Sequence, residues 1–154
     1  MSTDLVIHVD GACRGNPGPA GIGVVISQDG KVIKEISRAI GNATNNIAEY
    51  SALICALNEA MGLKAKKILV FTDSELVFKQ VTGVYKIKNE TIKVLSSQVR
   101  SLIKNFSHFE IKHVLREYNK DADRLASGIL DKGQAEVVAL LFDNSKEESP
   151  SSKG

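Results

Sequence analysis

Four acidic residues of this sequence stand where predicted strands end or predicted helices begin. Asp10 and Asp73 each come at the end of a run of apolar, largely β-branched residues, and Glu49 and Asp123 each fall in the first turn of a predicted helix. If the two strands are neighbours, the two carboxylates lie side by side, and each raises the other's pKa unless a cation lies between them. Hard oxygen ligands of this kind suit Mg²⁺ or Mn²⁺. The acids therefore predict a divalent-metal site.

Each of these acids also has a structural interpretation that involves no metal. Asn46-x-x-Glu49 resembles a capping box, in which Glu49 reaches back to the helix start. Asp73 or Ser74 could serve as a helix N-cap, and Asp123 could favour the positive end of a helix dipole. The residues alone leave both interpretations open.

The elements that must position these acids follow from the hydrophobic pattern. Strands are expected at residues 5–9, 21–27, 32–40, 68–72 and 108–115. Helices are expected from a cap at Asn45 or Asn46 to residue 61, from residue 75 to before Gly83, and at 91–105, 122–130 and 135–142. This order predicts an α/β fold with a mixed five-stranded sheet, an antiparallel meander followed by parallel strands, and helices on its faces.

Two details of the first three strands can be predicted. Asp29-Gly30 between two apolar runs is a strong hairpin signal. In the third strand Ile33, Ile36 and Ile40 do not alternate cleanly, which predicts a bulge or a bend.

Composition is typical of one soluble domain. The chain has 154 residues, of which 43% are hydrophobic and 25% charged, and no apolar run approaches the length of a membrane-spanning helix. Residues 1–4 do not resemble a signal peptide, and Cys13 and Cys55 are too few for a disulfide framework or a zinc site. We therefore expect a cytoplasmic protein with reduced thiols and no membrane partner. The expected domain covers residues 1–142, and the polar residues 143–154 are expected to form a disordered tail.

Four separate motifs resemble the type 1 ribonuclease H family. They are DGACRGNPGPAGIG at residues 10–23, TNNIAE at 44–49, TDS at 72–74 and REYNKDADRLA at 116–126, and the match spans about residues 4 to 130. The resemblance implies the ribonuclease H-like fold. It also implies an endonuclease that hydrolyses the RNA strand of an RNA/DNA hybrid and leaves 5′-phosphate and 3′-hydroxyl ends.

The resemblance assigns a role to each of the four acids. Asp10, Glu49, Asp73 and Asp123 match the metal-binding acids of the family, which uses two Mg²⁺ ions, with Mn²⁺ as an alternative. Asp10 would be the ligand shared by both ions. Glu49 would lie within reach of a 2′-hydroxyl, the group that distinguishes RNA from DNA.

Further residues are expected at the substrate. Cys13, Asn16, Thr44 and Asn45 match family positions that contact the hybrid. Many relatives also carry a basic, Trp-rich protrusion, but here that region is only the sequence YKIKN at 85–89, so hybrid binding would depend on Lys86 and Lys88, with Lys93 as a further contributor. Relatives with a mobile loop after the fifth strand carry a His there; this shorter loop has none, and Arg116 is the candidate for a cation near the leaving phosphate.

Three other functions remain open from sequence alone. A broader ribonuclease would also cut double-stranded RNA, whose minor groove presents 2′-hydroxyls as well. A non-catalytic nucleic-acid-binding module could use the same fold, although the four intact acids argue against it. A DNA nuclease of the wider superfamily is disfavoured by the Thr and Asn residues before Glu49. In each case we expect a monomer.

Overall fold

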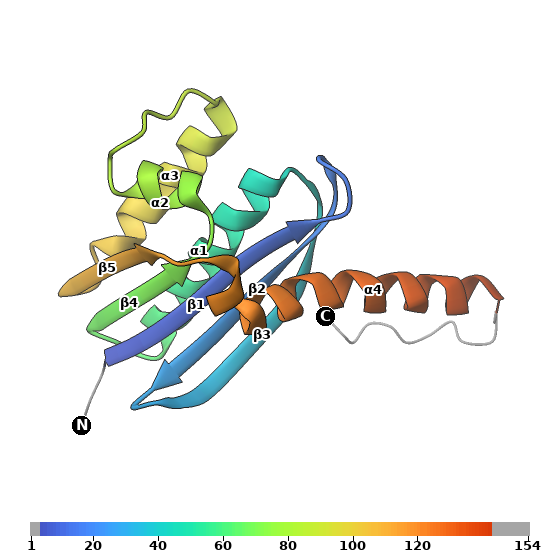
Figure 1. Ribbon diagram of the computed structural model, residues 1–154, viewed down its shortest axis with the longest axis horizontal. Coiled ribbons are helices and arrows are strands. Elements are labelled where there is room, and N and C mark those ends of the chain that lie inside the picture. The colour runs from blue at the N-terminus through green and yellow to red at the C-terminus, as the bar shows by residue number, and fades with distance from the viewer. Residues whose placement is uncertain (1–3, 143–154) are drawn as a thin grey trace.

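A five-stranded mixed sheet forms the centre of the protein (Figure 1). The computed structural model describes residues 4–142, with side chains through residue 131. In chain order its elements are β1 (Asp4–Cys13), β2 (Gly18–Gln28), β3 (Lys31–Ala43), α1 (Asn45–Gly62), β4 (Lys67–Thr72), α2 (Glu75–Val81), α3 (Glu90–Ile103), β5 (His108–His113), a 3₁₀ turn (Arg116–Tyr118) and α4 (Lys120–Phe142).

The strand order is β3-β2-β1-β4-β5. β1, β2 and β3 pair antiparallel, whereas β4 runs parallel to both β1 and β5. The α1 helix makes the crossover between the meander and the parallel strands, which places β4 directly beside β1. The predicted mixed sheet is therefore confirmed, together with the neighbouring positions of the strands that carry Asp10 and Asp73.

Helices cover both faces of the sheet, as expected. α1 packs against β1 and β2 on one face and contacts α3, while α4 crosses the other face over β2, β1 and β3. The side chains of β2 are buried on both of its faces from Ala20 to Val25 because the two helices sandwich this strand. The core lies mainly between the sheet and α1, where Tyr50, Leu53 and Leu57 are fully buried.

The irregular third strand contains two bulges. The pairing of β2 with β3 shifts between Ala20 and Gly21 and again between Ile26 and Ser27. At the two shifts Ile40 and Ile33 of β3 are left without a partner residue on β2. These are two of the isoleucines whose spacing broke the alternation, so the predicted bulge is confirmed.

Other boundaries differ from those expected. β1 extends to Cys13 because its last residues pair with β2, and β5 ends at His113, two residues early. The residues predicted as two helices, 122–130 and 135–142, belong to the single helix α4, and Gly133 does not interrupt it. One glycine costs a helix only about 1 kcal/mol, so helix-favouring neighbours can outweigh it. Residues 143–154, where a disordered tail is expected, lie outside the described residues.

Candidate active site

Three of the predicted acids meet at the carboxyl ends of the central parallel strands. Asp10 comes from β1, Asp73 directly follows β4, and Glu49 comes from the first turn and a half of α1. Each offers one carboxylate oxygen, and these oxygens all lie within 4.8 Å of one another. The parallel pairing of β1 with β4 brings the first two side by side, since Val9 pairs with Thr72 and both acids follow that pair.

Gly11 allows Glu49 to reach the cluster. A Cβ atom at Gly11 would lie 2.4 Å from the carbonyl carbon of Ala48, so α1 passes directly over this point of β1. At this distance the Gly11 N–H donates a 3.0 Å hydrogen bond to Glu49 Oε1. The Glu49 side chain therefore does not close a capping box.

The N-cap residues of α1 and α2 are Thr44 and Ser74. Thr44 Oγ1 accepts from the Ile47 N–H at the start of α1, and Ser74 Oγ accepts from the Val77 N–H at the start of α2. The cap predicted at Asn45 or Asn46 is therefore wrong by one or two residues. With Ser74 as the cap, the Asp73 carboxylate is left for the acid cluster.

Asp123 approaches the cluster from the opposite face of the sheet. Gly23 pairs with Asp10, and a Cβ atom there would lie 2.1 Å from the Ala122 carbonyl oxygen, so the start of α4 rests directly on β2. This contact places the Asp123 carboxyl near enough to raise the pKa of Asp10. Asp123 lies outside the group of three whose oxygens are within 4.8 Å of one another.

The acid cluster is electrostatically unfavourable in the absence of a cation. Burial raises the pKa of Asp10, which is only 4% exposed, and the nearby Glu49, Asp73 and Asp123 raise it further. Burial and the charge of Asp73 likewise raise the pKa of Glu49, while the Gly11 N–H, a hydrogen bond with Asp10 and the Arg116 charge act to lower it. Gathered carboxylates of this kind are stabilised by a divalent cation.

The donor set fits a hard divalent ion. All the converging ligand atoms are carboxylate oxygens, the donors that Mg²⁺ and Mn²⁺ take in proteins. Asn119 contacts this group through its Nδ2, which donates to Asp73 Oδ2 at 3.3 Å, and its Oδ1 is a buried acceptor with no hydrogen-bond partner within the described part of the chain. The three acids are thus positioned for metal binding, and the identity of the ion is left to experiment.

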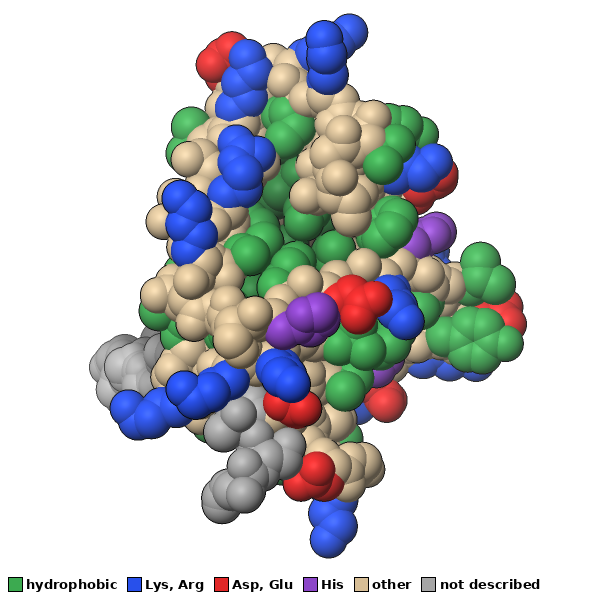
Figure 2. Space-filling view, turned by 90° about the vertical axis from the view of Figure 1, so that its left-hand side faces the viewer, with side chains coloured by type: hydrophobic (Ala, Val, Ile, Leu, Met, Phe, Trp, Pro, Cys, Tyr) green, Lys and Arg blue, Asp and Glu red, His purple; other side chains and the backbone are tan. Residues whose placement is uncertain are grey.

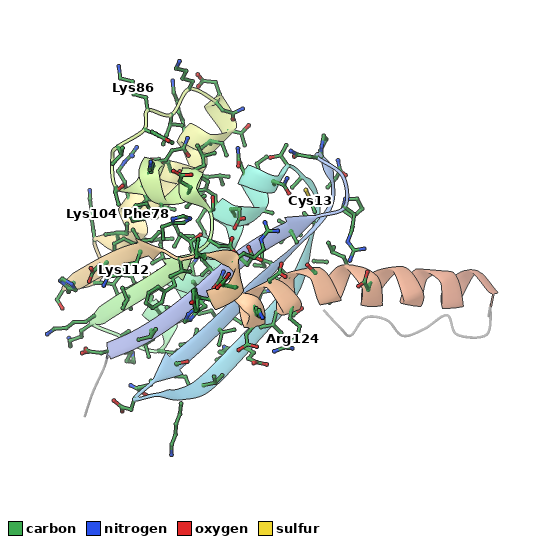
Figure 3. All side chains as sticks on the ribbon, viewed as in Figure 1. Cys13, Phe78, Lys86, Lys104, Lys112 and Arg124 are labelled. Carbon is green, nitrogen blue, oxygen red and sulfur yellow. The ribbon has the colours of Figure 1, made fainter. Side chains whose placement is uncertain are left out.

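The residues expected at the hybrid backbone form a second group at the amino end of α1. The Cys13 thiol donates to Asn45 Oδ1 at 2.9 Å, and the Asn45 N–H donates to Asn16 Oδ1 at 3.0 Å. Thr44 caps the same helix. Cys13, Asn16 and Asn45 therefore form one hydrogen-bonded group, and Thr44 directly precedes Asn45; Figure 3 shows Cys13 near the loop between β1 and β2.

The cationic candidates lie in two different places. Arg116, in the 3₁₀ turn, is near enough to Glu49 for its charge to act on that carboxyl. Lys86 and Lys88 are exposed on the connection between α2 and α3, and Lys86 extends outward at the far side from Cys13 (Figure 3). Lys93 pairs with Glu90 at 3.4 Å. Figure 2 shows Lys and Arg side chains at the top and along one margin of the face that carries β5.

Three residues that matter to this geometry had no assigned role from sequence. Gly11 and Gly23 permit the close helix approaches, and buried Asn119 contacts Asp73. All three fall inside the quoted motifs. Glycine and asparagine occur in strands and turns for many reasons, so the sequence alone does not indicate what these three residues do. Their roles follow from the packing in the structure.

Comparison with known proteins identifies similar chains. The family described as reverse transcriptase-like matches residues 8–128. The bifunctional protein Rv2228c of Mycobacterium tuberculosis is 41% identical over 155 residues, a match that covers 97% of this chain and 42% of that protein. Ribonuclease HI of Halobacterium salinarum is 43% identical over 125 residues, covering 80% of this chain and 63% of that protein. This chain thus spans less than two thirds of either relative.

A solved structure matches the fold closely. LC11-RNase H1 in complex with RNA/DNA hybrid superposes with a TM-score of 0.80 at 39% identity, and the match covers 84% of this chain and 99% of that one. Among the described residues, no helix is both long and apolar enough to cross a membrane.

Proposed function

Since this chain belongs to the reverse transcriptase-like family and, within it, to the type 1 ribonuclease H group, we propose that it is an endonuclease that hydrolyses the RNA strand of RNA/DNA hybrids. The observation that carries the proposal is the convergence of Asp10, Glu49 and Asp73, whose carboxylate oxygens lie within 4.8 Å of one another. The similarity to a ribonuclease H1 seen with an RNA/DNA hybrid supports the choice of substrate.

The proposed site uses Asp10, Glu49, Asp73 and Asp123 to hold two divalent ions, Mg²⁺ or Mn²⁺. Bound ions would supply activation of the attacking water and neutralisation of the charge that develops on the phosphate and the leaving 3′-oxygen. The products would carry 5′-phosphate and 3′-hydroxyl ends. The raised pKa values of Asp10 and Glu49 support this assignment, because a cation removes the repulsion that raises them.

The chain's own residues have three tasks in this proposal. The acids would hold the divalent ions that bind the scissile phosphate, in front of the carboxyl ends of β1 and β4. Arg116 contributes a positive charge beside Glu49, where it can stabilise negative charge on the phosphate. Glu49 accepts a hydrogen bond from the adjacent 2′-hydroxyl and thereby selects the RNA strand.

Hybrid binding is proposed to involve two surfaces. Cys13, Asn16, Thr44 and Asn45 offer short polar groups beside the acid cluster, where they can contact sugar and phosphate atoms of one strand. Lys86 and Lys88 offer mobile charges to a neighbouring phosphate stretch. Phosphate contacts provide affinity and orientation, while the 2′-hydroxyl contact provides discrimination.

Cleavage of an end-labelled RNA/DNA hybrid tests the proposal. Duplex RNA and duplex DNA are run beside the hybrid, with Mg²⁺, with Mn²⁺ and with chelator, for the wild type and for Asp10→Asn. We expect metal-dependent cutting of the RNA strand that falls by at least about 10³-fold in Asp10→Asn, since an essential ligand is removed. Ligation or phosphatase treatment of the products identifies their ends.

The other arms of the experiment decide between the alternatives. Cutting of duplex RNA at a comparable rate would replace the hybrid-specific assignment with a broader ribonuclease. A folded wild type that binds hybrid but cuts nothing with either metal would indicate a nucleic-acid-binding module. The monomeric state and the cytoplasmic location stay predictions, and sedimentation and cell fractionation test them.

A further inference from the structure

Asn119 connects the elements that carry the acids. It lies between the 3₁₀ turn and α4 and is only 1% exposed. Its Nδ2 group donates to the Val9 carbonyl at 2.8 Å and to Asp73 Oδ2 at 3.3 Å. Both partners are acceptors, so the orientation of the amide is fixed by its surroundings.

The backbone of Asn119 adds a third connection. Its carbonyl oxygen accepts a 3.1 Å hydrogen bond from the Asp123 N–H in the first turn of α4. One residue therefore contacts the backbone directly before Asp10, the carboxylate of Asp73, and the turn that carries Asp123.

The other side of the amide is unusual. Asn119 Oδ1 is buried and has no hydrogen-bond partner within the described residues, although nearly all buried polar atoms in proteins have one. An aliphatic side chain of similar size would fill the space without leaving an acceptor unpaired. An amide here is thus explained by the donors that it offers to Val9 and Asp73.

We propose that Asn119 is a positioning residue that keeps Asp73 in the geometry needed to bind metal. Repulsion from Asp10 and Glu49 pushes the Asp73 carboxylate away from the cluster, and the Nδ2–H donor opposes that movement by binding one of its oxygens. The other oxygen of Asp73 is then directed to the ion. This inference rests on the proposed function of the acid cluster as a metal site.

The side-chain type agrees with this role. Aspartate at position 119 would have the same shape but no N–H donor, and its charge would add to the repulsion among the acids. Serine could donate to only one of the two partners. Asparagine supplies two donors without a charge, which is what the two acceptors Val9 O and Asp73 Oδ2 require.

The test compares Mn²⁺ binding and hybrid cleavage in the full chain. Mn²⁺ alone is titrated by calorimetry into the wild type and Asn119→Ala, and kcat and KM for the hybrid are measured in parallel. We expect Asn119→Ala to bind Mn²⁺ about 10- to 100-fold more weakly and to lose kcat by a similar factor, with KM for the hybrid changed less than about twofold. Raising the Mn²⁺ concentration should restore part of kcat.

A matched control separates positioning from a general loss of stability. Val99→Ala in α3 removes part of a side chain that is 1% exposed and packs in the main core, so it lowers Tm while Mn²⁺ affinity stays at the wild-type value. If Asn119→Ala does not fold, Asn119→Leu, which fills the space but has no donor, takes its place. A wild-type Mn²⁺ affinity and kcat in a folded Asn119 variant overturn the inference.

A double-mutant cycle with Asp73→Asn tests whether Asn119 affects Mn²⁺ binding through Asp73. If Asn119 acts through Asp73, Asn119→Ala causes no further loss of Mn²⁺ affinity once Asp73 has been replaced; an equal loss in both backgrounds contradicts the inference. The two proposals fail separately. A wild type that binds Mn²⁺ but cuts no hybrid overturns the proposed function, while the Mn²⁺ comparison still decides the role of Asn119.

Discussion

The acid cluster and the lysine segment at residues 85–89 contrast in how they are built. The acids lie on β1, α1 and the end of β4, in a setting where Asp10 is 4% exposed and neighbouring groups bind Glu49 and Asp73. Lys86 and Lys88 lie on an exposed connection without helix or strand, and neither forms an ion pair among the described residues. Hydrogen bonds and packing fix the side chains of the acid cluster, whereas the lysine segment presents positive charge without a fixed geometry.

This difference matches the two tasks proposed for them. Metal binding and phosphate hydrolysis require ligand positions that are accurate to a fraction of an ångström, which buried strands and close-packed helices provide. Attraction of a polyanion depends on net positive charge and tolerates movement. We therefore expect small displacements of the acids to reduce kcat strongly. Removal of charge from the lysines should weaken hybrid binding by a small amount per charge.

Among the changes that leave every acid in place, the largest effect is expected from adding a single methyl group at Gly11. In Gly11→Ala the new Cβ would lie 2.4 Å from the Ala48 carbonyl carbon, so α1 must shift and Glu49 moves away from Asp10. Displacement of this size costs on the order of 10²-fold in kcat, and overpacking lowers stability by about 1–3 kcal/mol. Hybrid cleavage and thermal unfolding measure the two effects.

Gly62→Ala is the matched control for that prediction. Among the described residues, apart from its chain neighbours and its own helix backbone, no atom lies within 4 Å of a Cβ built at Gly62, and this residue ends α1 far from the acids. Its activity should stay within about twofold of the wild type. Equal activity in Gly11→Ala and Gly62→Ala would contradict the claim that close packing fixes Glu49.

The second prediction concerns stability and pH in the presence of chelator. The folded-state pKa values of Asp10 and Glu49 are raised above their unfolded values, so the folded state keeps protons that the unfolded state releases. The resulting stabilisation is complete below about pH 4 and is lost as pH rises toward the folded pKa values. We expect Tm without metal to be roughly 5 °C lower at pH 8 than at pH 5.

Asp10→Asn sharpens this prediction. It removes one of the repelling charges, so in chelator at pH 8 it should raise Tm above that of the wild type while it abolishes cleavage. Mn²⁺ or Mg²⁺ should raise the wild-type Tm and have less effect on the variant. A wild-type Tm that is the same at pH 5 and pH 8 in chelator would show that the acids do not repel one another as described.

The third prediction concerns Arg116, a cation that shares one property with each of the two regions. Arg116 is exposed like the lysines, yet its charge acts on Glu49. Arg116→Ala should lower kcat about tenfold with a smaller change in KM, because the charge is proposed to act on the phosphate during hydrolysis. Arg116→Lys should recover part of the loss. Unchanged kcat and KM in Arg116→Ala would remove Arg116 from the mechanism.

The same contrast explains which features the sequence could predict. Alternating and continuous apolar runs gave the five strands, and acids at strand ends indicated the metal site, because burial leaves a strong pattern in residue types. The irregular spacing of Ile33, Ile36 and Ile40 predicted a bulge or a bend in the third strand, and two bulges occur there. The motifs added the family, and with it the roles of the four acids and the expected substrate.

Features that depend on contact between distant segments could not be predicted. The Gly11 bond to Glu49 depends on how α1 crosses β1, and the role of Asn119 depends on its burial beside Asp73. The two helices predicted at 122–130 and 135–142 form one helix, and Gly133 between them costs that helix little. Local patterns carry no information about such packing.

The smallest effect is expected at the lysine segment. Lys86→Ala combined with Lys88→Ala removes two charges that are proposed to contact phosphates, so KM for the hybrid should rise about three- to tenfold at low salt while kcat stays nearly constant. The slope of log affinity against log salt should fall by about two, one for each phosphate contact. Lys31→Ala, on the exposed start of β3 in the β2–β3 hairpin, is the control and should leave the slope unchanged. A double variant with the wild-type salt slope would show that this segment does not contact phosphates. The proposed contacts to the hybrid would then be those of the group around Asn16 and Asn45 alone.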